Sequence, residues 1–590
     1  MGARRRWVLR RLASERGPAF AILLGVLVSV PSMTVGFFND DLLHRLALEE
    51  QVADFTPGAH ALYDFVDGEE RGDAMRARGY LPWFSEPDLR LRFFRPISSL
   101  LLALDHHAFG RSALAAHLHS LVWLLLVATF VGLLYRRVLR PATATVATAI
   151  YVLAGGHAST LGWLAARHTL VSATFAAGAI WAFVSWHQTG ERWRGWLAPA
   201  LLTLGLLASE TALGAIPFLV LYAWIVMERP WGARIRASLP SILIGLAYLG
   251  FYALEGWGAH GSGTYRSPFD DPTGFAAALL LRIPPLLGEL YGGVPVTFWA
   301  LLEPARPIFW ALGALAFGAC AGLLYWQRET FRPPERRRAL WLGLSSVVCL
   351  APMVGTVLDG RLLSVALIGA AALLGTAFVQ TFITTGRLSG PKRAAPRAMV
   401  IALALGAFAL SPLVRLAAPL AMDSFADAEE SLAETAELTA CPDDGLAYLV
   451  TGADPTLSYY SGPAMWFHRP DEYRRLRALR VLSMAPHDQT LRGHEGGFTL
   501  EVDVDHRTGN LFERVYRVSD LPAGARVRAG ELTATVEAAD GPYPRVVRFD
   551  SDALDAVCLV RWDGDRLVAF PPPAPGETVA IPHALGPMGL

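Results

Sequence analysis

The chain has 590 residues, of which 53% are apolar and only 18% are charged. Soluble globular proteins carry about 25% charged residues. This composition, with a mean hydropathy of +0.35, therefore excludes an ordinary soluble enzyme and indicates a membrane protein. The 52 Lys and Arg residues balance 52 Asp and Glu residues, so no net charge attracts the chain to nucleic acid.

Uninterrupted apolar runs predict about eleven transmembrane helices, because a bilayer core of about 30 Å needs ~20 helical residues. The first run, 19–38, follows a basic N-terminus, 1–18, and lacks a small-residue cleavage site, which is typical of an uncleaved anchor with a cytoplasmic N-terminus. The expected fold is mainly α, a polytopic helical bundle over 19–420. The predicted spans are 19–38, 114–134, 142–158, 167–186, 196–208, 211–227, 238–256, 307–326, 339–357, 362–384 and 398–420.

Alternating the sides of the membrane from the first span places the arginine-rich loops in the cytoplasm, as the positive-inside rule requires. The same alternation leaves three stretches outside, where we expect the chemistry. These are a first loop over 39–113, a loop over 257–306 that suits a flap above a cavity, and everything after 420.

The last region, 421–590, has the composition of a soluble domain. An acidic helical stretch, 423–438, joins it to the last span, and Gly, Pro and Asp turn signals separate its short β-type runs. These runs are 446–451, 498–504, 531–536 and 557–562. Cys441 and Cys558 share this region and can form one bridge if it lies in an oxidising compartment. The sequence predicts a small β-rich domain.

Two adjacent carboxylates, Asp40 and Asp41, stand where the first span leaves the lipid. Ionisable groups at such depth are costly and indicate function by default. The alternative is structural, because Asn39 or Asp40 can cap a helix from Asp41 to about residue 52. Neighbouring helical residues point about 100° apart, so one carboxylate can face a reaction cavity while the other caps the helix or holds a cation.

A second charged motif lies near the end of the first loop. Arg92 and Arg95 precede Pro96, which fits the first position of a helix, and an apolar segment over 97–109 follows. A helix N-terminus with an arginine ahead of it suits a phosphate. The alternative is that both arginines snorkel beside an interfacial helix and hold it at the headgroups.

Several short motifs follow one another along 19–385. They are Asp40-Asp41, Arg95-Pro96-Ile97-Ser98-Ser99, His117-Leu118, the stretch 163–170 with Trp163 and Arg167, Ala208-Ser209-Glu210-Thr211-Ala212 and Gly360-Arg361-Leu362. In this order they resemble the GT-C superfamily of polytopic membrane glycosyltransferases, in particular the branch of protein O-mannosyltransferases and their tetratricopeptide-bearing transmembrane relatives. Ser159, Ser209 and Gly360 depart from that pattern, where the relatives have Glu, Lys and Glu.

The resemblance implies a hexosyltransferase that moves a sugar from a polyprenyl-phosphate donor to an extracytoplasmic protein, lipid or glycan acceptor, with inversion of the anomeric centre. Asp40 or Asp41 would be the catalytic base. The resemblance and the predicted positions assign donor-phosphate binding to Arg92, Arg95, Arg167 and Arg361, and substrate positioning or a structural role to Glu210, His117 and Trp163. The setting expected is a bacterial inner membrane, with the C-terminal domain outside.

Alternatives stay open at several of these positions. Arg167 and Arg361 can equally anchor helix ends, and Glu210 can form a purely structural ion pair. A Mg²⁺ or Mn²⁺ ion on Asp40 and Asp41 is compatible with the residue types, although no ligand spacing demands one. Trp466, His468 and Tyr473 can stack on a sugar, with core packing as the simpler expectation.

Two other classes compete with the glycosyltransferase. Many spans with a few buried charges also describe a secondary transporter, although no internal pseudo-repeat is visible and the charges gather at the predicted outer edges. A catalytically inactive membrane scaffold would explain the departures from the family pattern.

Overall fold

The computed structural model describes residues 3–49, 58–387, 391–453, 455–503, 511–541 and 543–586. The chain divides into two compact units. The first comprises Met1–Val35, Phe94–Gly256 and Asp271–Met422, and the second comprises Gly36–Phe93, Trp257–Asp270 and Asp423–Leu590. The second unit thus takes up part of the first predicted outer loop as well as the C-terminal region.

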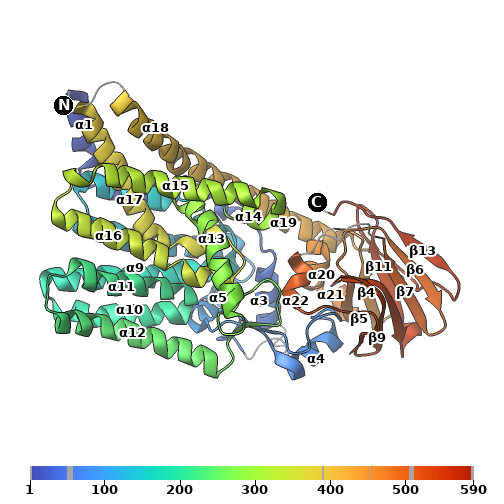
Figure 1. The fold of residues 1–590 in the computed structure, drawn as a ribbon. Coiled ribbons are helices and arrows are strands. Elements are labelled where there is room, and N and C mark those ends of the chain that lie inside the picture. The colour runs from blue at the N-terminus through green and yellow to red at the C-terminus, as the bar shows by residue number, and fades with distance from the viewer. Residues whose placement is uncertain are drawn as a thin grey trace. The chain divides into compact units, whose positions relative to one another are not determined.

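The first unit is helical (Figure 1). Its helices are α1 (Ala3–Leu12), α2 (Gly17–Val28), α5 (Pro96–Phe109), α6 (Ala113–Val138), α7 (Pro141–Leu153), α8 (His157–Gly162), α9 (Arg167–Thr189), α10 (Arg192–Ala208), α11 (Ala215–Leu221), α12 (Trp231–Leu254), α13 (Pro272–Gly292), α14 (Thr297–Leu301), α15 (Arg306–Trp326), α16 (Pro333–Val348), α17 (Ala366–Thr384), α18 (Pro391–Leu405) and α19 (Ser411–Thr435), whose end enters the second unit. The 3₁₀ or π turns are η1 (Val30–Met33), η2 (Leu164–Ala166), η3 (Glu210–Gly214), η4 (Tyr222–Val226), η5 (Glu303–Ala305), η6 (Arg328–Thr330), η7 (Ala351–Gly355), η8 (Gly360–Leu363), η9 (Thr385–Arg387) and η10 (Gly406–Leu410).

Eight helices among the described residues are long and apolar enough to cross a membrane, and three further apolar helices, Gly17–Val28, Pro141–Leu153 and Glu210–Val226, are shorter. The mainly α, multi-pass membrane class predicted from the sequence is therefore confirmed. Helix α5 begins at Pro96, as predicted, because proline preorganises the first turn and its missing N–H costs nothing there.

This unit differs from a soluble protein in that large apolar side chains lie on its outside as well as in its centre. The centre is formed by α9 and α17, whose buried faces are rich in alanine, and such small residues let neighbouring helices approach closely. The outer helices leave large apolar side chains exposed, among them Leu280 at 75% and Leu315 at 69%. Exposed apolar surface of this kind suits contact with lipid.

The stretch 257–306, predicted as an outer loop, contains helix α13 (Pro272–Gly292), whose length and apolar composition suit a membrane span. The sequence did not indicate this helix, because Pro284 and Pro285 lie inside it. Membrane helices tolerate prolines because neighbouring groups take up the backbone carbonyls that lose their donors. Only Trp257–Asp270 from this stretch belongs to the second unit.

The second unit contains three sheets. The small antiparallel sheet has the strand order β1-β2-β3, and the mixed sheet has the order β12-β11-β4-β5. The larger antiparallel sheet has the order β13-β6-β7-β10-β9-β8. The strands are β1 (Asp64–Asp67), β2 (Arg90–Arg92), β3 (Gly258–His260), β4 (Gly445–Val450), β5 (Leu476–Ser483), β6 (Gln489–His494), β7 (Gly497–Val502), β8 (Arg526–Ala529), β9 (Leu532–Asp540), β10 (Tyr543–Ser551), β11 (Val557–Trp562), β12 (Leu567–Phe570) and β13 (Thr578–Ile581). Its helices are α3 (Asp40–Glu49), α4 (Gly68–Arg78), α20 (Pro455–His468), α21 (Pro470–Arg475), α22 (Leu511–Tyr516) and the turn η11 (Leu554–Ala556).

The four β-type runs predicted in the C-terminal region correspond to β4, β7, β9 and β11, so the β-rich character is confirmed. Residue 504, the predicted end of the second run, and residues 50–52, the predicted end of α3, lie outside the described residues. The pairing of β2 with β3 joins the first outer loop to the segment 257–270, which the sequence did not predict.

A disulfide joins Cys441 to Cys558, with the two Cα atoms 5.1 Å apart. Cys558 lies on β11, beside β4 in the mixed sheet, and the bridge ties this sheet to the segment that leads out of α19. The bond closes a sequence separation of 117 residues. A cross-link over so long a loop removes much of the conformational freedom of the unfolded chain.

We expect the double variant Cys441→Ser/Cys558→Ser to lose about 2–5 kcal/mol of stability in the second unit, because the unfolded chain regains that freedom. Thermal unfolding of the full chain in detergent, with limited proteolysis of the β-rich part, measures the loss. Cys349→Ser is the matched control, since its Sγ makes only a 3.3 Å bond to the Ser346 carbonyl that a serine can also make. Equal melting of the double variant and wild type would contradict the expectation.

Candidate functional site

The entry to α3 is held in an unusual backbone conformation. Asn39 has φ +54°, a left-handed value that asparagine tolerates better than most residues. Its backbone N–H donates to both oxygens of the Glu429 carboxylate, at 3.0 and 3.3 Å. Glu429 lies near the end of α19, so the last long helix fixes the direction in which α3 begins.

The two adjacent carboxylates differ in exposure, as the turn of about 100° per helical residue allows. Asp41 is buried, with 4% of its surface exposed. Asp40 is half-buried and lines a cavity. One of its carboxylate oxygens, Oδ1, accepts a hydrogen bond of 3.1 Å from the Tyr460 hydroxyl on α20. Asp40 is thus the carboxylate that a bound molecule can reach.

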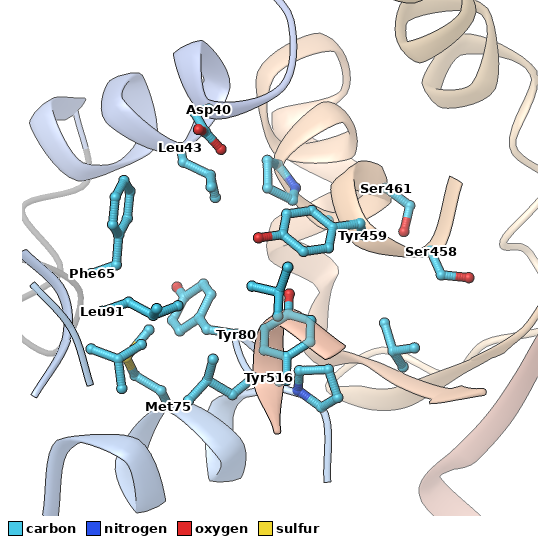
Figure 2. A pocket seen from close by; sticks show the side chains of 18 of the residues that line it. Asp40, Leu43, Phe65, Met75, Tyr80, Leu91, Ser458, Tyr459, Ser461 and Tyr516 are labelled. Atoms are coloured by element: carbon cyan, nitrogen blue, oxygen red, sulfur yellow. The ribbon is translucent and has the colours of Figure 1, made fainter. Parts of the chain in front are cut away.

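The cavity beside Asp40 has a volume of about 150 Å³. Figure 2 shows Asp40 and Leu43 at the top, Phe65, Leu91 and Met75 on the left with Tyr80 beside Leu91, and the rings of Tyr459 and Tyr516 opposite them. Its walls come from α3, β1, α4 and β2 in the first loop and from β4, β5, α20, α21 and α22 in the C-terminal region. Tyr265, from the segment 257–270, completes it.

Three phenols of the second unit surround the Asp40 charge. Burial, together with that negative charge, raises the pKa of Tyr459, Tyr460 and Tyr516 above the ordinary tyrosine value. These side chains therefore remain protonated at any physiological pH and can donate hydrogen bonds. The rings of Tyr459 and Tyr516 lie with centroids 5.4 Å apart.

The three aromatic residues considered for sugar stacking, Trp466, His468 and Tyr473, lie in different places in the structure. Trp466 is 2% exposed and belongs to the core, as the simpler expectation had it. Tyr473 lines the cavity. His468 is not among the lining residues, and its Nδ1 lies 3.9 Å from Glu430.

Arg92, on β2, is held by two carboxylates. Its guanidinium contacts Asp64 at 3.2 Å and Asp67 at 2.9 Å. The same guanidinium lies over the Trp257 ring, 4.4 Å from its centroid. These contacts tie the first loop to the segment 257–270.

In the first unit, buried Arg95 and half-buried Glu210 form an ion pair. Arg95 Nε donates to Glu210 Oε2 at 3.0 Å, and Nη2 donates to Oε1. Arg95 Nη1 also lies 3.1 Å from His168 Nε2, and the other nitrogen of that ring is 3.1 Å from the Ser209 hydroxyl. The structure therefore brings together three motifs that are far apart in the sequence.

Arg167 is 2% exposed and bonded on every side of its guanidinium. It pairs with Asp105, donates to the Ser120 hydroxyl at 2.8 Å and donates to the Ala116 carbonyl at 3.0 Å. His119 Nδ1 lies 3.2 Å away. A guanidinium so enclosed holds α5, α6 and α9 together.

His117 is also fully buried, on α6. Its Nδ1 lies 2.7 Å from the Leu161 carbonyl and its Nε2 lies 3.0 Å from the Val35 carbonyl. The imidazole thus links α8 to the chain that follows the first anchor helix and positions the two segments.

Arg361 differs from the other candidate arginines. Its guanidinium stacks on Trp163, 4.5 Å from the ring centroid, and its Nε is 3.9 Å from Asp359. No described residue accepts a hydrogen bond from this guanidinium. Asp359 caps η8 by accepting the Arg361 backbone N–H at 2.9 Å and has Ser159 and Thr297 hydroxyls within 3.5 Å.

Within the part of the chain that the structure describes, no group of three or more His, Cys, Asp or Glu side chains is placed to hold a metal ion. Asp40 and Asp41 have the right chemistry for Mg²⁺ or Mn²⁺, but among the described residues no third such side chain joins them in a group that could hold the ion, so the residues do not fit a divalent site. We derive no step through a metal.

The sequence analysis missed four residues of these sites. Tyr460, Tyr516 and Glu429 lie in the C-terminal region and carry no motif. The Tyr459-Tyr460 pair, one turn inside a helix that starts with proline, was a weak signal. Asp359 directly precedes Gly360-Arg361, so of the four it was the easiest to predict from the sequence.

Neither protein-family models nor curated proteins match this chain. Among solved structures, it is similar to the oligosaccharyltransferase of Archaeoglobus fulgidus tethered to an acceptor peptide, with 13% identity and a TM-score of 0.42 over 79% of this chain. The chain spans 64% of the length of that enzyme. It is also similar to ArnT of Cupriavidus metallidurans bound to undecaprenyl phosphate, with 14% identity and a TM-score of 0.39, over 80% of this chain and 90% of ArnT. Likenesses at this level carry no argument about function, so the function is argued from the site.

We expect Arg167→Met to destabilise the first unit by about 3–5 kcal/mol, because it leaves the Asp105 carboxylate buried without its cation. The double variant Arg167→Met/Asp105→Leu should recover much of that loss, since both charges are then gone. Thermal unfolding in detergent, followed by tryptophan fluorescence, gives the two values. Additive losses would show that the pair is not coupled in the folded protein.

Proposed function

We propose that the protein is an integral membrane glycosyltransferase, which transfers a sugar from a polyprenyl-phosphate donor to a hydroxyl of an extracytoplasmic acceptor. One observation carries the proposal. Asp40, in the acidic motif after the first span, lines a cavity and is oriented by the Tyr460 hydroxyl and by the Glu429 carboxylate that binds the preceding residue. A carboxylate oriented in this way is suited to act as a general base.

In the proposed reaction, Asp40 accepts the proton of the acceptor hydroxyl as its oxygen forms a bond to the anomeric carbon. The bond from that carbon to the donor phosphate breaks on the opposite face, and the electron pair leaves with the phosphate. Attack opposite the leaving group inverts the anomeric centre, and the transition state resembles an oxocarbenium ion. General-base catalysis of this kind typically contributes about 10²- to 10⁴-fold.

Within the first unit, we propose Arg361 as a phosphate-binding residue. Its guanidinium is presented on the Trp163 ring and gives no hydrogen bond to a described residue, so its donors suit a bidentate grip on phosphate oxygens. Arg92, Arg95 and Arg167 each engage a carboxylate, and we assign them, with Glu210 and His117, to positioning.

We further propose a bacterial inner-membrane location with the N-terminus in the cytoplasm and the β-rich region outside. The disulfide between Cys441 and Cys558 supports this orientation, because such bonds persist in oxidising compartments. The arginines at the N-terminus support it as well.

We expect Asp40→Asn to lower the turnover number by about 10²- to 10⁴-fold, because an amide cannot accept the proton. The assay follows release of free polyprenyl phosphate from a panel of synthetic polyprenyl-phosphate hexoses, by mass spectrometry, with purified full-length protein. Asp427→Asn, the same substitution at an exposed position on α19, is the control. Normal turnover of a well-folded Asp40→Asn protein would reject the proposed function.

The orientation is open to a labelling test, because the native cysteines are either bridged or buried. In right-side-out membrane vesicles, we expect Asp565→Cys to react with an impermeant maleimide and Arg336→Cys to react only after lysis. Both positions are exposed in the structure. The reverse pattern would place the β-rich region in the cytoplasm.

A further inference from the structure

The cavity beside Asp40 has the size of a single ring. A cavity of about 150 Å³ is large enough for one six-membered ring and well below the roughly 300–1,000 Å³ of sites for larger ligands. Its occupant is therefore one compact group, such as the end of a longer molecule that enters with its terminal unit.

The walls combine flat apolar surface with hydrogen-bonding groups. Five tyrosines line the cavity, namely Tyr80, Tyr265, Tyr459, Tyr473 and Tyr516, together with two phenylalanines and several aliphatic side chains. Ser461, on α20, adds a buried hydroxyl that has no hydrogen-bond partner among the described residues. Covering the Ser461 hydroxyl with a purely apolar ring would leave it unsatisfied, at a cost of about 1–3 kcal/mol. The occupant must therefore offer both an apolar face and hydroxyl groups.

The charges of the lining residues further limit the chemical class of the ligand. Asp40 is the only charged residue among the described residues that line the cavity, and no Lys, Arg or His accompanies it. A phosphate, sulfate or carboxylate would be repelled by Asp40 and find no cation. The described lining therefore favours a ligand without negative charge over the donor phosphate.

We propose that this cavity is the acceptor site and that the acceptor is a neutral saccharide, a pyranose that stacks on the tyrosine rings and presents a hydroxyl to Asp40. This assignment rests on the proposed function. A Ser or Thr side chain of a peptide would leave most of the cavity empty. A quaternary ammonium group suits aromatic rings and a carboxylate, but it offers no hydrogen bond to Ser461 or the phenols.

The test measures binding directly. Saturation-transfer NMR with the full-length protein, in a detergent without a sugar headgroup, uses a panel of methyl glycosides of glucose, mannose, galactose and N-acetylglucosamine. We expect at least one glycoside to bind, and its affinity to fall at least about tenfold in Ser461→Leu, whose side chain occupies part of the cavity. Ser461→Ala, which removes only the hydroxyl, should weaken binding about 2- to 10-fold.

Ser431→Leu, the same change at an exposed position on α19, is the matched control and should bind as the wild type does. The inference is overturned if no glycoside binds, if Ser461→Leu binds as tightly as Ser431→Leu, or if only tetramethylammonium or a Ser/Thr peptide binds in a Ser461-dependent way. If Asp40→Asn loses sugar transfer while glycosides fail to bind, the acceptor inference alone falls. If Asp40→Asn transfers sugar normally, the proposed function falls and takes the acceptor inference with it.

Discussion

The carboxylate of Asp40 is held by residues that lie about 400 positions further along the chain. Tyr460 bonds the carboxylate itself, at a sequence separation of 420, and Glu429 bonds the backbone of the preceding residue, at a separation of 390. A short helix after a membrane anchor would otherwise be free to reorient, because its first N–H groups have no partners within the helix. The C-terminal region therefore holds the Asp40 carboxylate in place, and it also supplies about half of the cavity wall.

The cost of charge in an apolar environment explains the arrangement of the first unit. Arg95 and Arg167 each meet a carboxylate, and histidine or hydroxyl groups take up the remaining donors. Removing one member of such a pair leaves the other charge buried without a partner, so a single substitution lowers the stability of the fold. Arg361 departs from this pattern, since it stacks on an indole and leaves its donors unused by described residues. A guanidinium held in this way remains available to an anion brought by a ligand.

Local signals in the sequence predicted much of the fold. Apolar runs located the membrane helices, Pro96 marked the start of α5, and alternating short runs marked β4, β7, β9 and β11. Helix α13 was not predicted, because Pro284 and Pro285 lie inside it. Asp40 was identified because it follows a membrane anchor, whereas Tyr460, Glu429 and Ser461 come together only through the tertiary fold. No spacing in a single sequence encodes such contacts.

Two departures from the motif pattern that the sequence resembles coincide with contacts to partners in other segments. At Ser159, where the relatives have glutamate, the hydroxyl lies within 3.5 Å of Asp359, so a carboxylate remains at that place but comes from another segment. At Ser209, where they have lysine, the hydroxyl meets His168, which contacts Arg95. The cation beside Glu210 is then Arg95 rather than a neighbouring lysine. Within the first unit, a partner lost at one position is thus supplied from another element, which keeps Arg95 and Glu210 paired.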